Sequence, residues 1–480
     1  MNCHRCLQTS LSALLASCMY LAGQPADLSI AIENGQPRLS WPSQGASKVY
    51  TLQHRTDLSQ PDWAPLFPWD QWPISDTAFL DTTGPEAARF YRLAVTERGR
   101  ARSVTLQETA SAASIGSIIL FAEIVYGIDI PFAASHSVSV YRIDYETLDG
   151  WLGPTVASGA LFIPAGMPAA ASLLSYQHGT IHLRSEAPSN PGALERNIGL
   201  IAASHGYVVA MPDFLGLGVG STLTHPYVHR RSSATAVVDL LRAVRSSVTG
   251  VAAIQQALPH GLSDKLFLLG YSQGAYVTLA AQKEIEEKHG AEFTITASAP
   301  SDGPYDLSGT MADIMTAPRS YPSPNYLPYV LLTYNTIYRL FDDPAEVLVQ
   351  PYAATLPPLF DGMHTGSEID AAMPQSGIPS EILQPAFLQA FTTDPDHPFR
   401  MVLRENDLLG WAPVSPTRLY HCAADDVVPH RNATVAYASF IAAGADTNRV
   451  QLVDPDPAAT HGTCLFSGVP LILSWFESLR

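Results

Sequence analysis

The chain has 480 residues, enough at about 150 residues per domain for two or three domains and a large hydrophobic core. Its 27 Lys and Arg against 44 Asp and Glu give a formal net charge of −17, which repels phosphate backbones, so no nucleic acid partner is expected. Because 46% of the residues are hydrophobic and only 15% are charged, the composition excludes a disordered chain and indicates a compact fold.

Residues 1–24 have the pattern of an export signal. Arg5 precedes the uncharged run Leu7–Gly23, which is short for a membrane span but has the length of a signal-peptide core. Two outcomes of export remain open. The sequence Leu-Ala-Ser-Cys18 resembles a bacterial lipobox, in which Cys18 is lipidated and anchors the protein in the cell envelope, whereas simple cleavage further on would release a secreted protein. A buried N-terminal helix is the third alternative.

Residues 25–96 predict a small all-β sandwich, because short alternating runs are broken by turn residues. The predicted strands are Leu28–Glu33, Pro37–Trp41, Lys48–His54, Ala78–Asp81 and Phe90–Val95. The motifs LSWP, YTLQHRTDLS and RFYRL resemble the fibronectin-III-like modules of bacterial exported enzymes. Four tryptophans fall in this region, and we favour a core role over a glycan-binding face for them. They are Trp41, Trp63, Trp69 and Trp72.

Residues 97–115, rich in Arg, Ser and Ala, are expected to be a linker. From residue 116 to 480, short apolar runs separated by helical stretches predict an α/β domain with a mostly parallel sheet covered on both faces. The predicted strands are Val138–Tyr145, Thr155–Pro164, Ala171–Tyr176, Tyr207–Met211, Lys265–Leu269, Phe293–Ala297, Arg418–His421 and Arg449–Val453. More than a hundred residues rich in Pro, Tyr and Leu interrupt this rhythm, which predicts a functional cap over about 304–412.

The pattern Gly270-Tyr-Ser272-Gln-Gly274 follows the apolar run Lys265–Leu269 and precedes a helical stretch of small residues. Glycine on both sides is what a sharp strand-to-helix turn needs, because larger side chains would collide there and the serine hydroxyl must project from the sheet. The N-terminus of the following helix favours a developing negative charge. Ser272 is therefore the predicted nucleophile, with an incidental tight turn as the alternative.

A serine hydroxyl needs a histidine to take its proton and a carboxylate to orient that histidine, and in this arrangement the chain order is Ser, acid, His. The pattern Asp-x-x-Val-Pro selects Asp425 as the acid, and its neighbour Asp426 is the alternative acid or a helix-capping residue. His461, in a loop after the last predicted strand, is the predicted base. Four other histidines are expected to be core, turn or surface residues: His205, His225, His229 and His421.

Two backbone N–H groups should stabilise the oxyanion of an acyl-transfer reaction. The predicted donors are Gln273, beside the nucleophile, and Gly179 or Thr180 in the loop Tyr-Gln-His-Gly-Thr that follows a strand. The segment Pro212–Ser221 contains three alternating glycines but lacks the G-x-G-x-x-G spacing, so it predicts a turn beside the site and not a nucleotide-binding loop. The pattern implies no metal and no organic cofactor.

The motifs Tyr-Gln-His-Gly-Thr, Pro-Asp-Phe-x-Gly-x-Gly, Gly-Tyr-Ser-Gln-Gly, Asp-Asp-Val-Val-Pro and Thr-His-Gly occur in the order found in α/β-hydrolases. Over about 116–480 the chain resembles the secretory lipases of the fungal lipase-A type and their exported bacterial esterase relatives. The resemblance implies an eight-strand sheet, a helical cap between strands six and seven, a Ser-Asp-His triad and hydrolysis of carboxylic esters or lipids. The turn departs from the family in reading Ser-Gln-Gly-Ala, without a run of glycines, and the cap sequence does not align by eye.

Three of the five cysteines lie in the signal segment, which leaves Cys422 and Cys464. Cys422 precedes Asp425 by three residues and Cys464 follows His461 by three, so assembly of the triad would bring both cysteines together. A Cys422–Cys464 disulfide is expected in an oxidising compartment, with two free buried thiols as the alternative.

We therefore expect an exported serine hydrolase that cleaves esters of small molecules or lipids. A lipase needs an apolar acyl pocket, for which the cap offers candidates that are also explained as ordinary cap core: Tyr326, Tyr329, Leu331, Leu332 and Tyr338. Two alternatives stay open, a serine peptidase of the same fold and a non-catalytic envelope protein whose β-sandwich binds glycans. Membrane contact is expected only through a lipidated Cys18.

Overall fold

The computed structural model describes residues 27–59, 63–66, 71–83, 89–220 and 223–480. The predicted signal segment, including Cys18, therefore lies outside the described residues. The chain divides into two compact units, one made of residues 1–100 and 146–156 and the other of residues 101–145 and 157–480. Within the described residues, no helix is both long and apolar enough to pass through a membrane.

The N-terminal unit contains the predicted β-sandwich, built from two three-stranded antiparallel sheets in the orders β1-β2-β5 and β4-β3-β6. Its strands are β1 (Ser29–Glu33), β2 (Gln36–Ser40), β3 (Val49–Arg55), β4 (Ala64–Pro65), β5 (Ala78–Leu80) and β6 (Phe90–Thr96). Trp41 packs on Tyr50 across the sheets with ring centroids 5.7 Å apart. Trp41, Trp63 and Trp72 are all buried, so these tryptophans belong to the core, and Trp69 lies outside the described residues.

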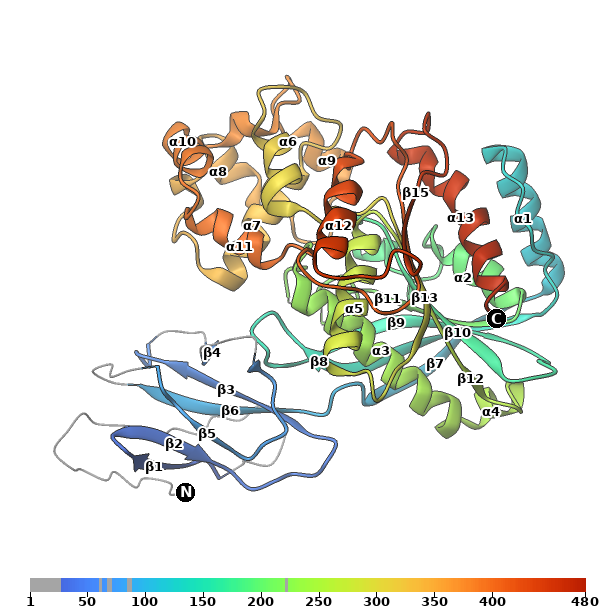
Figure 1. The fold of residues 1–480 in the computed structure, drawn as a ribbon, viewed down its shortest axis with the longest axis horizontal. Helices are drawn as coiled ribbons and strands as arrows, with labels where there is room; N and C mark the ends of the chain where they lie inside the picture. The colour runs from blue at the N-terminus through green and yellow to red at the C-terminus, as the bar shows by residue number, and fades with distance from the viewer. Residues whose placement is uncertain (1–26, 60–62, 67–70, 84–88, 221–222) are drawn as a thin grey trace. The chain divides into compact units, whose positions relative to one another are not determined.

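The second unit is built on one nine-stranded sheet in the order β15-β14-β13-β12-β10-β11-β9-β8-β7 (Figure 1). The strands from β11 to β15 pair in parallel, whereas β9 pairs antiparallel with β11 and β7 with β8. Their bounds are β7 Ala101–Ala110, β8 Val138–Leu148, β9 Pro154–Pro164, β10 Ala171–Gln177, β11 Tyr207–Pro212, β12 Leu262–Tyr271, β13 Ile295–Ser301, β14 Thr417–Tyr420 and β15 Val450–Val453. The predicted mostly parallel α/β sheet is confirmed.

The sheet has one strand more than the eight expected, because residues 97–115 are not a linker. They contain β7, which pairs with β8 at the sheet edge, and the start of helix α1 (Ala112–Tyr126). All the β7 side chains are exposed or half-buried, and the strand carries Arg, Ser, Thr and Glu in place of an apolar run. A polar edge strand discourages pairing with other chains, and its composition resembles that of a linker.

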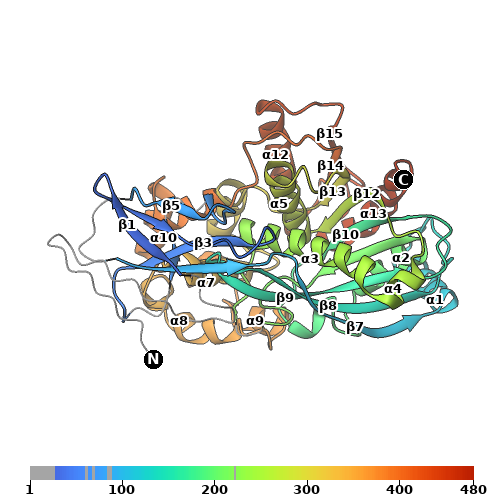
Figure 2. The same ribbon diagram turned by 90° about the horizontal axis from the view of Figure 1, so that it is seen from below.

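Both faces of the sheet are covered by helices because the central strands are apolar on both sides. In β12, Leu266 and Leu268 face one core, and Phe267 and Leu269 face the other. Helices α3 (Arg230–Gly250), α4 (Ala252–Ala257), α5 (Gln273–Lys288) and α12 (Arg431–Ala442) cover the first face (Figure 2). Helices α1, α2 (Arg196–Ser204) and α13 (His461–Glu477) cover the second face and lie together in Figure 1.

The predicted cap is confirmed as the segment between β13 and β14. Its α-helices, grouped above one end of the sheet in Figure 1, are α6 (Ala312–Thr316), α7 (Tyr326–Tyr338), α8 (Tyr352–Thr355), α9 (Gly366–Ala371), α10 (Pro385–Thr393) and α11 (Pro398–Glu405). Short turns of helix precede or separate them at Leu307–Met311, Pro344–Glu346, Pro357–Leu359 and Pro379–Ile382. The abundant prolines begin many of these helices, because a proline at the first helical position loses no intrahelical hydrogen bond.

Candidate active site

Ser272 occupies the sharp turn between β12 and α5. Its φ of 57° and ψ of −120° lie outside the conformations that a serine adopts freely, so the turn is strained. A Cβ added at Gly274 would lie 2.0 Å from the carbonyl oxygen of Gln177, and one added at Gly270 would lie 2.2 Å from that of Gly274. Both flanking positions therefore admit only glycine, and the turn presents the Ser272 hydroxyl at the carboxyl end of the sheet.

The structure brings Ser272, His461 and Asp425 into one chain of hydrogen bonds. The Nε2 atom of His461 lies 2.9 Å from the Oγ atom of Ser272, and its Nδ1 atom lies 2.7 Å from Oδ2 of Asp425. The three residues come from the end of β12, the first position of α13 and the loop after β14. All three are buried, so water does not compete strongly for these contacts.

Backbone and side-chain donors surround the carboxylate of Asp425. Its Oδ1 accepts the N–H groups of Val427 and Val428 at 2.9 and 2.8 Å. Burial alone would raise the pKa of Asp425, but contacts with His421 and His461 outweigh burial and hold its pKa below the ordinary value. Asp425 is therefore ionised at neutral pH and stabilises the Nδ1–H tautomer of His461.

Two neighbours fix the main chain and ring of His461. The hydroxyl of Tyr271 donates to the His461 carbonyl, and the two rings stack at 5.1 Å. The His461 N–H donates to Oδ1 of Asp426 at 3.1 Å. The capping alternative for Asp426 is wrong, because α12 begins at Arg431 after His430. The two adjacent carboxylates thus hold the same histidine, Asp425 through its ring and Asp426 through its backbone.

The predicted disulfide is present. Cys422 and Cys464 are joined with their Cα atoms 5.9 Å apart, and both are fully buried. The bond links the loop that carries Asp425 to the helix that begins at His461. It therefore ties the acid and the base to each other across 42 residues of sequence.

The oxyanion prediction needs one correction. The N–H of Gly179 donates to both carboxylate oxygens of Glu195, at 3.0 and 3.2 Å, so Gly179 is not a free donor. Among the residues that the structure describes, the N–H groups of Gln273 and Thr180 have no acceptor within the protein. The loop lies against the serine turn, since Gln177 contacts Gly274. Gln273 and Thr180 thus remain the predicted donors.

Two further residues belong to the site: Glu195, for which the sequence predicts no role, and His225, which it places among the core, turn or surface histidines. Glu195 accepts the hydroxyl of Tyr176 at 2.6 Å as well as the Gly179 N–H, and so fixes the loop. Nε2 of His225 lies 2.7 Å from Nε2 of Gln273, while Nδ1 of His225 donates to the Leu215 carbonyl. Burial lowers the pKa of His225 to about 3, so the ring is neutral and its Nε2 accepts from Gln273. No local motif marks either residue.

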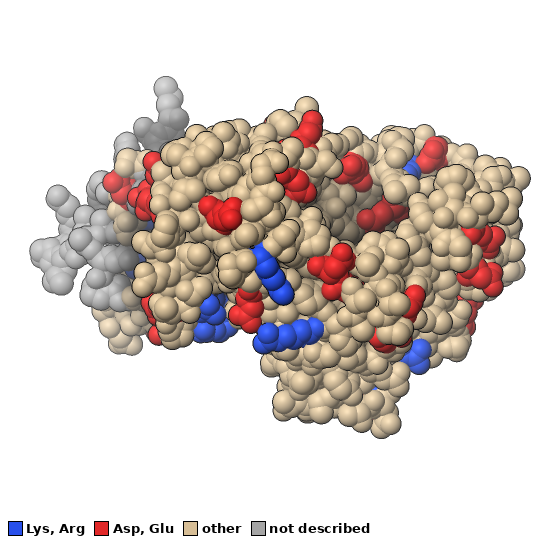
Figure 3. Space-filling model, turned by 90° about the horizontal axis from the view of Figure 1, so that it is seen from above, with Lys and Arg blue, Asp and Glu red and all other residues tan. Residues whose placement is uncertain are grey.

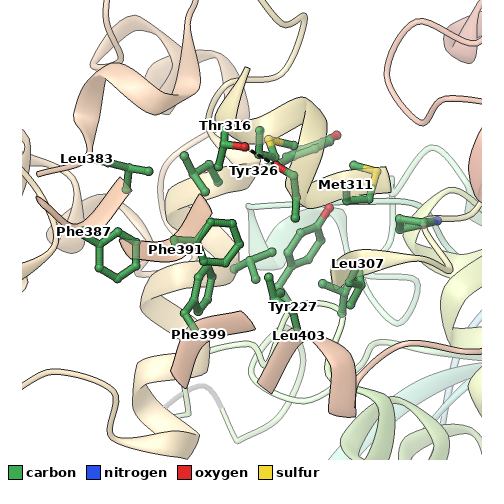
Figure 4. A pocket seen from close by; sticks show the side chains of 16 residues that line it. Tyr227, Leu307, Met311, Thr316, Tyr326, Leu383, Phe387, Phe391, Phe399 and Leu403 are labelled. Carbon is green, nitrogen blue, oxygen red and sulfur yellow. Dashed lines mark hydrogen bonds between the residues drawn. The ribbon is translucent and has the colours of Figure 1, made fainter. Parts of the chain in front are cut away.

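An apolar pocket opens inside the cap (Figure 4). The cavity volume is about 60 Å³, and the 16 lining residues include no charged side chain. Tyr227 lines the pocket, and its hydroxyl oxygen lies 3.0 Å from Oγ1 of Thr180. One wall of the pocket is therefore in contact with the predicted oxyanion loop. Of the cap residues proposed from the sequence, Tyr326 lines this pocket, whereas Leu331 is fully buried core.

The net charge of the chain disfavours anionic ligands. Figure 3 shows more acidic than basic side chains on the face seen from above, in keeping with the net charge of −17. Two clusters of the described residues have the spacing of metal ligands, Asp302 with the two cysteines and Asp302 with His421 and Asp425. The cysteines form the disulfide, and Asp425 and His421 already make hydrogen bonds within the protein. Neither cluster needs a metal to explain it.

The fold is that of an α/β-hydrolase. Its defining features are a mostly parallel sheet with helices on both faces, a serine on a strand-to-helix turn and an inserted helical cap. No family model matches the chain, and no curated protein matches it. Among solved structures, it is similar to the rice cell wall degrading esterase LipA from Xanthomonas oryzae, with 30% identity and a TM-score of 0.69 over 80% of this chain and all of that one.

Two further structures share the fold. A Legionella pneumophila protein assigned as a hydrolase is 25% identical, with a TM-score of 0.70 over 79% of this chain and 98% of that one. Candida antarctica lipase A is 16% identical, with a TM-score of 0.58 over 80% of this chain and 82% of that one. The chain belongs to the same α/β-hydrolase family as the LipA esterase, and its fold is that of the esterases and lipases.

Proposed function

We propose that this chain is a serine esterase that cleaves carboxylic esters through Ser272, His461 and Asp425. The observation that carries the proposal is the unbroken hydrogen-bond chain from Ser272 Oγ through both nitrogens of His461 to Asp425, at 2.9 and 2.7 Å. This geometry fits a base that takes the serine proton while a fixed carboxylate stabilises the imidazolium that forms.

In the acylation step, Nε2 of His461 takes the proton of Ser272 as Oγ bonds to the ester carbonyl carbon. The N–H groups of Gln273 and Thr180 stabilise the oxyanion, a contribution of about 2.7–4 kcal/mol for one donor. The intermediate collapses as the carbon–oxygen bond to the alcohol breaks and His461 returns its proton to the departing alcohol. In deacylation, His461 activates water in the same way, and the acid leaves while Ser272 regains its proton.

We further propose that the apolar cap pocket receives the acyl group of the ester. The pocket has no charged lining residue, and one of its lining residues, Tyr227, contacts the side chain of Thr180, the predicted oxyanion donor. An apolar chain would gain about 0.8 kcal/mol per buried methylene there. A peptidase would need a charged anchor for a peptide terminus, and the pocket lining offers none, which favours the ester over the amide substrate.

Export through residues 1–24 is part of the proposal, with lipidation of Cys18 or simple release as its two forms, and it is supported by the sequence pattern alone. The two-sheet geometry of the N-terminal unit supports a fibronectin-III-like identity. A glycan contact by this unit stays a prediction that the buried Trp41, Trp63 and Trp72 do not support.

The test is hydrolysis of a panel of p-nitrophenyl esters of increasing acyl length, beside aminoacyl-p-nitroanilides. The purified protein is compared with Ser272→Ala and with Ser117→Ala, which changes an exposed serine of α1 and serves as the matched control. We expect ester turnover that Ser272→Ala abolishes and Ser117→Ala retains. Full ester turnover in Ser272→Ala would refute the proposed nucleophile, and anilide turnover without ester turnover would favour the peptidase.

A further inference from the structure

A second buried pair of titratable side chains lies against the carboxylate of Asp425. His421 follows β14, Asp302 follows β13, and both are fully buried. Nε2 of His421 lies 3.4 Å from Oδ2 of Asp425, the same oxygen that contacts His461, and 4.0 Å from Oδ1 of Asp302. One carboxylate oxygen of Asp425 therefore faces two imidazole rings, of which the proposed mechanism uses only that of His461.

The hydrogen bonds of His421 determine which ring nitrogen carries hydrogen. Nε2 lies 2.7 Å from the carbonyl oxygen of Val428, and since a carbonyl only accepts, Nε2 carries a hydrogen that is directed to Val428 and Asp425. Val428 also donates its own N–H to Asp425. His421 thus holds the acid loop by two points, the carbonyl of Val428 and the carboxylate of Asp425.

Asp302 supplies a second carboxylate beside His421. Burial raises the pKa of Asp302, and the charge of His421 and the Ser301 hydroxyl oppose that rise. Oδ1 of Asp302 accepts the N–H of Cys422 at 3.2 Å and its Oδ2 accepts the Ser301 hydroxyl at 2.6 Å. Two ionised carboxylates this close to one ring nitrogen repel each other in a buried site, and either a cation between them or a proton on one of them relieves the repulsion. Burial lowers the pKa of His421, but the hydrogen bond to Asp425 and the charges of Asp302 and Asp425 outweigh burial and raise its pKa.

We propose that His421 is a positioning residue for the reaction, which with Asp302 forms an internal ion pair that keeps Asp425 charged and sets the proton affinity of His461. The proposal rests on the esterase mechanism proposed above. A cation at His421 opposes protonation of His461, whereas an anion at Asp302 favours it. Removal of each partner should therefore move the pH dependence of the reaction in opposite directions.

Titratable groups from every element packed around this pair contribute to the charge balance at Asp425. They are Tyr271 at the end of β12, Asp302 after β13, Asp425 in the loop after β14, His430 before α12 and His461 at the start of α13. Burial, reinforced by nearby carboxylates, raises the pKa of Tyr271, so its hydroxyl stays neutral. Burial and the charge of His421 lower the pKa of His430, so it is uncharged at neutral pH.

The first experiment is the pH profile of kcat/KM for p-nitrophenyl butyrate in the full-length protein. The acid limb of this profile reports protonation of His461 in the free enzyme. We expect His421→Gln to shift the acid limb to higher pH by at least half a pH unit. We expect Asp302→Asn to shift it to lower pH. His260→Gln, the same change at an exposed histidine before β12, should leave the limb unmoved. Because a positioning residue does not bind substrate, kcat should fall about tenfold or more in His421→Gln with KM nearly unchanged.

An acid limb that stays in place in a folded His421→Gln protein would overturn the proposal, as would shifts of the same sign in both variants. If the variants fail to fold, ¹⁵N-histidine NMR of the unmodified protein decides. We expect one buried histidine to keep both ring nitrogens protonated well above pH 6.5, and its absence would also overturn the proposal. The NMR measurement reports the protonation of the histidine and does not depend on ester turnover. Failure of the esterase proposal would instead show as a wild-type protein that hydrolyses no ester.

Discussion

Removal of the disulfide between Cys422 and Cys464 tests whether the bond holds the acid and base loops together. The bond closes a loop with a sequence separation of 42, and the chain-entropy relation for a loop of that length gives a stabilisation of about 4 kcal/mol at 25 °C. The appropriate change is the double substitution Cys422→Ala with Cys464→Ala. Both positions are fully buried, and serine there would add the separate cost of an unpaired hydroxyl, about 1–3 kcal/mol.

We expect the double variant to lose about 4 kcal/mol of unfolding free energy, and its kcat to fall by up to about 100-fold, the cost of a misplacement of about 1 Å in the site. Equilibrium urea unfolding followed by circular dichroism measures the first quantity, and ester turnover across the same urea series measures the second. Dithiothreitol should act slowly on the native wild type, because both sulfur atoms are buried, and should leave the double variant unaffected as the control. A variant with wild-type unfolding and wild-type kcat would refute the reasoning.

Three further substitutions test other contacts. Asp425→Asn should lower kcat/KM for a p-nitrophenyl ester by about 10⁴-fold, because the amide favours the wrong histidine tautomer, whereas Asp426→Asn keeps an acceptor and should lose far less. Gly274→Ala should yield little folded, active enzyme, since its Cβ would lie 2.0 Å from a carbonyl oxygen, while Gly462→Ala has open space and should be tolerated. Ala312→Phe should fill the cap pocket and lower turnover of long-chain esters about fourfold per excluded methylene, with short-chain turnover unchanged.

The sequence determined the parts of the molecule whose geometry is local. The glycines at 270 and 274 predict the sharp turn around Ser272. The structure adds the reason at Gly274, where a Cβ would lie 2.0 Å from the carbonyl oxygen of Gln177 at the end of β10. Apolar runs identify buried parallel strands, since a strand covered on both faces has no polar side. The spacing of Cys422 and Cys464 from Asp425 and His461 also predicts the disulfide, but only on the assumption that the triad assembles.

Contacts between distant segments could not be derived from the sequence. Strand β7 is stabilised by pairing with β8 and carries no apolar pattern, so its residues resembled a linker. The Gly179 N–H donates to Glu195, which lies 16 residues further along the chain, and no sequence pattern indicates that hydrogen bond. The sequence marks His421 only as an ordinary core, turn or surface histidine. Its place beside Asp302, which follows β13, is visible only in the folded structure.

Motifs and apolar runs in the sequence thus predicted the turn, the strands and the order of the candidate residues. The choice of hydrogen-bond donors, the arrangement of charges behind Asp425 and the edge of the sheet were decided only when the chain folded. The physical reason is that a hydrogen bond or an ion pair depends on atoms about 3–4 Å apart in space, and in this protein those atoms come from residues as far apart in the sequence as Ser272 and His461.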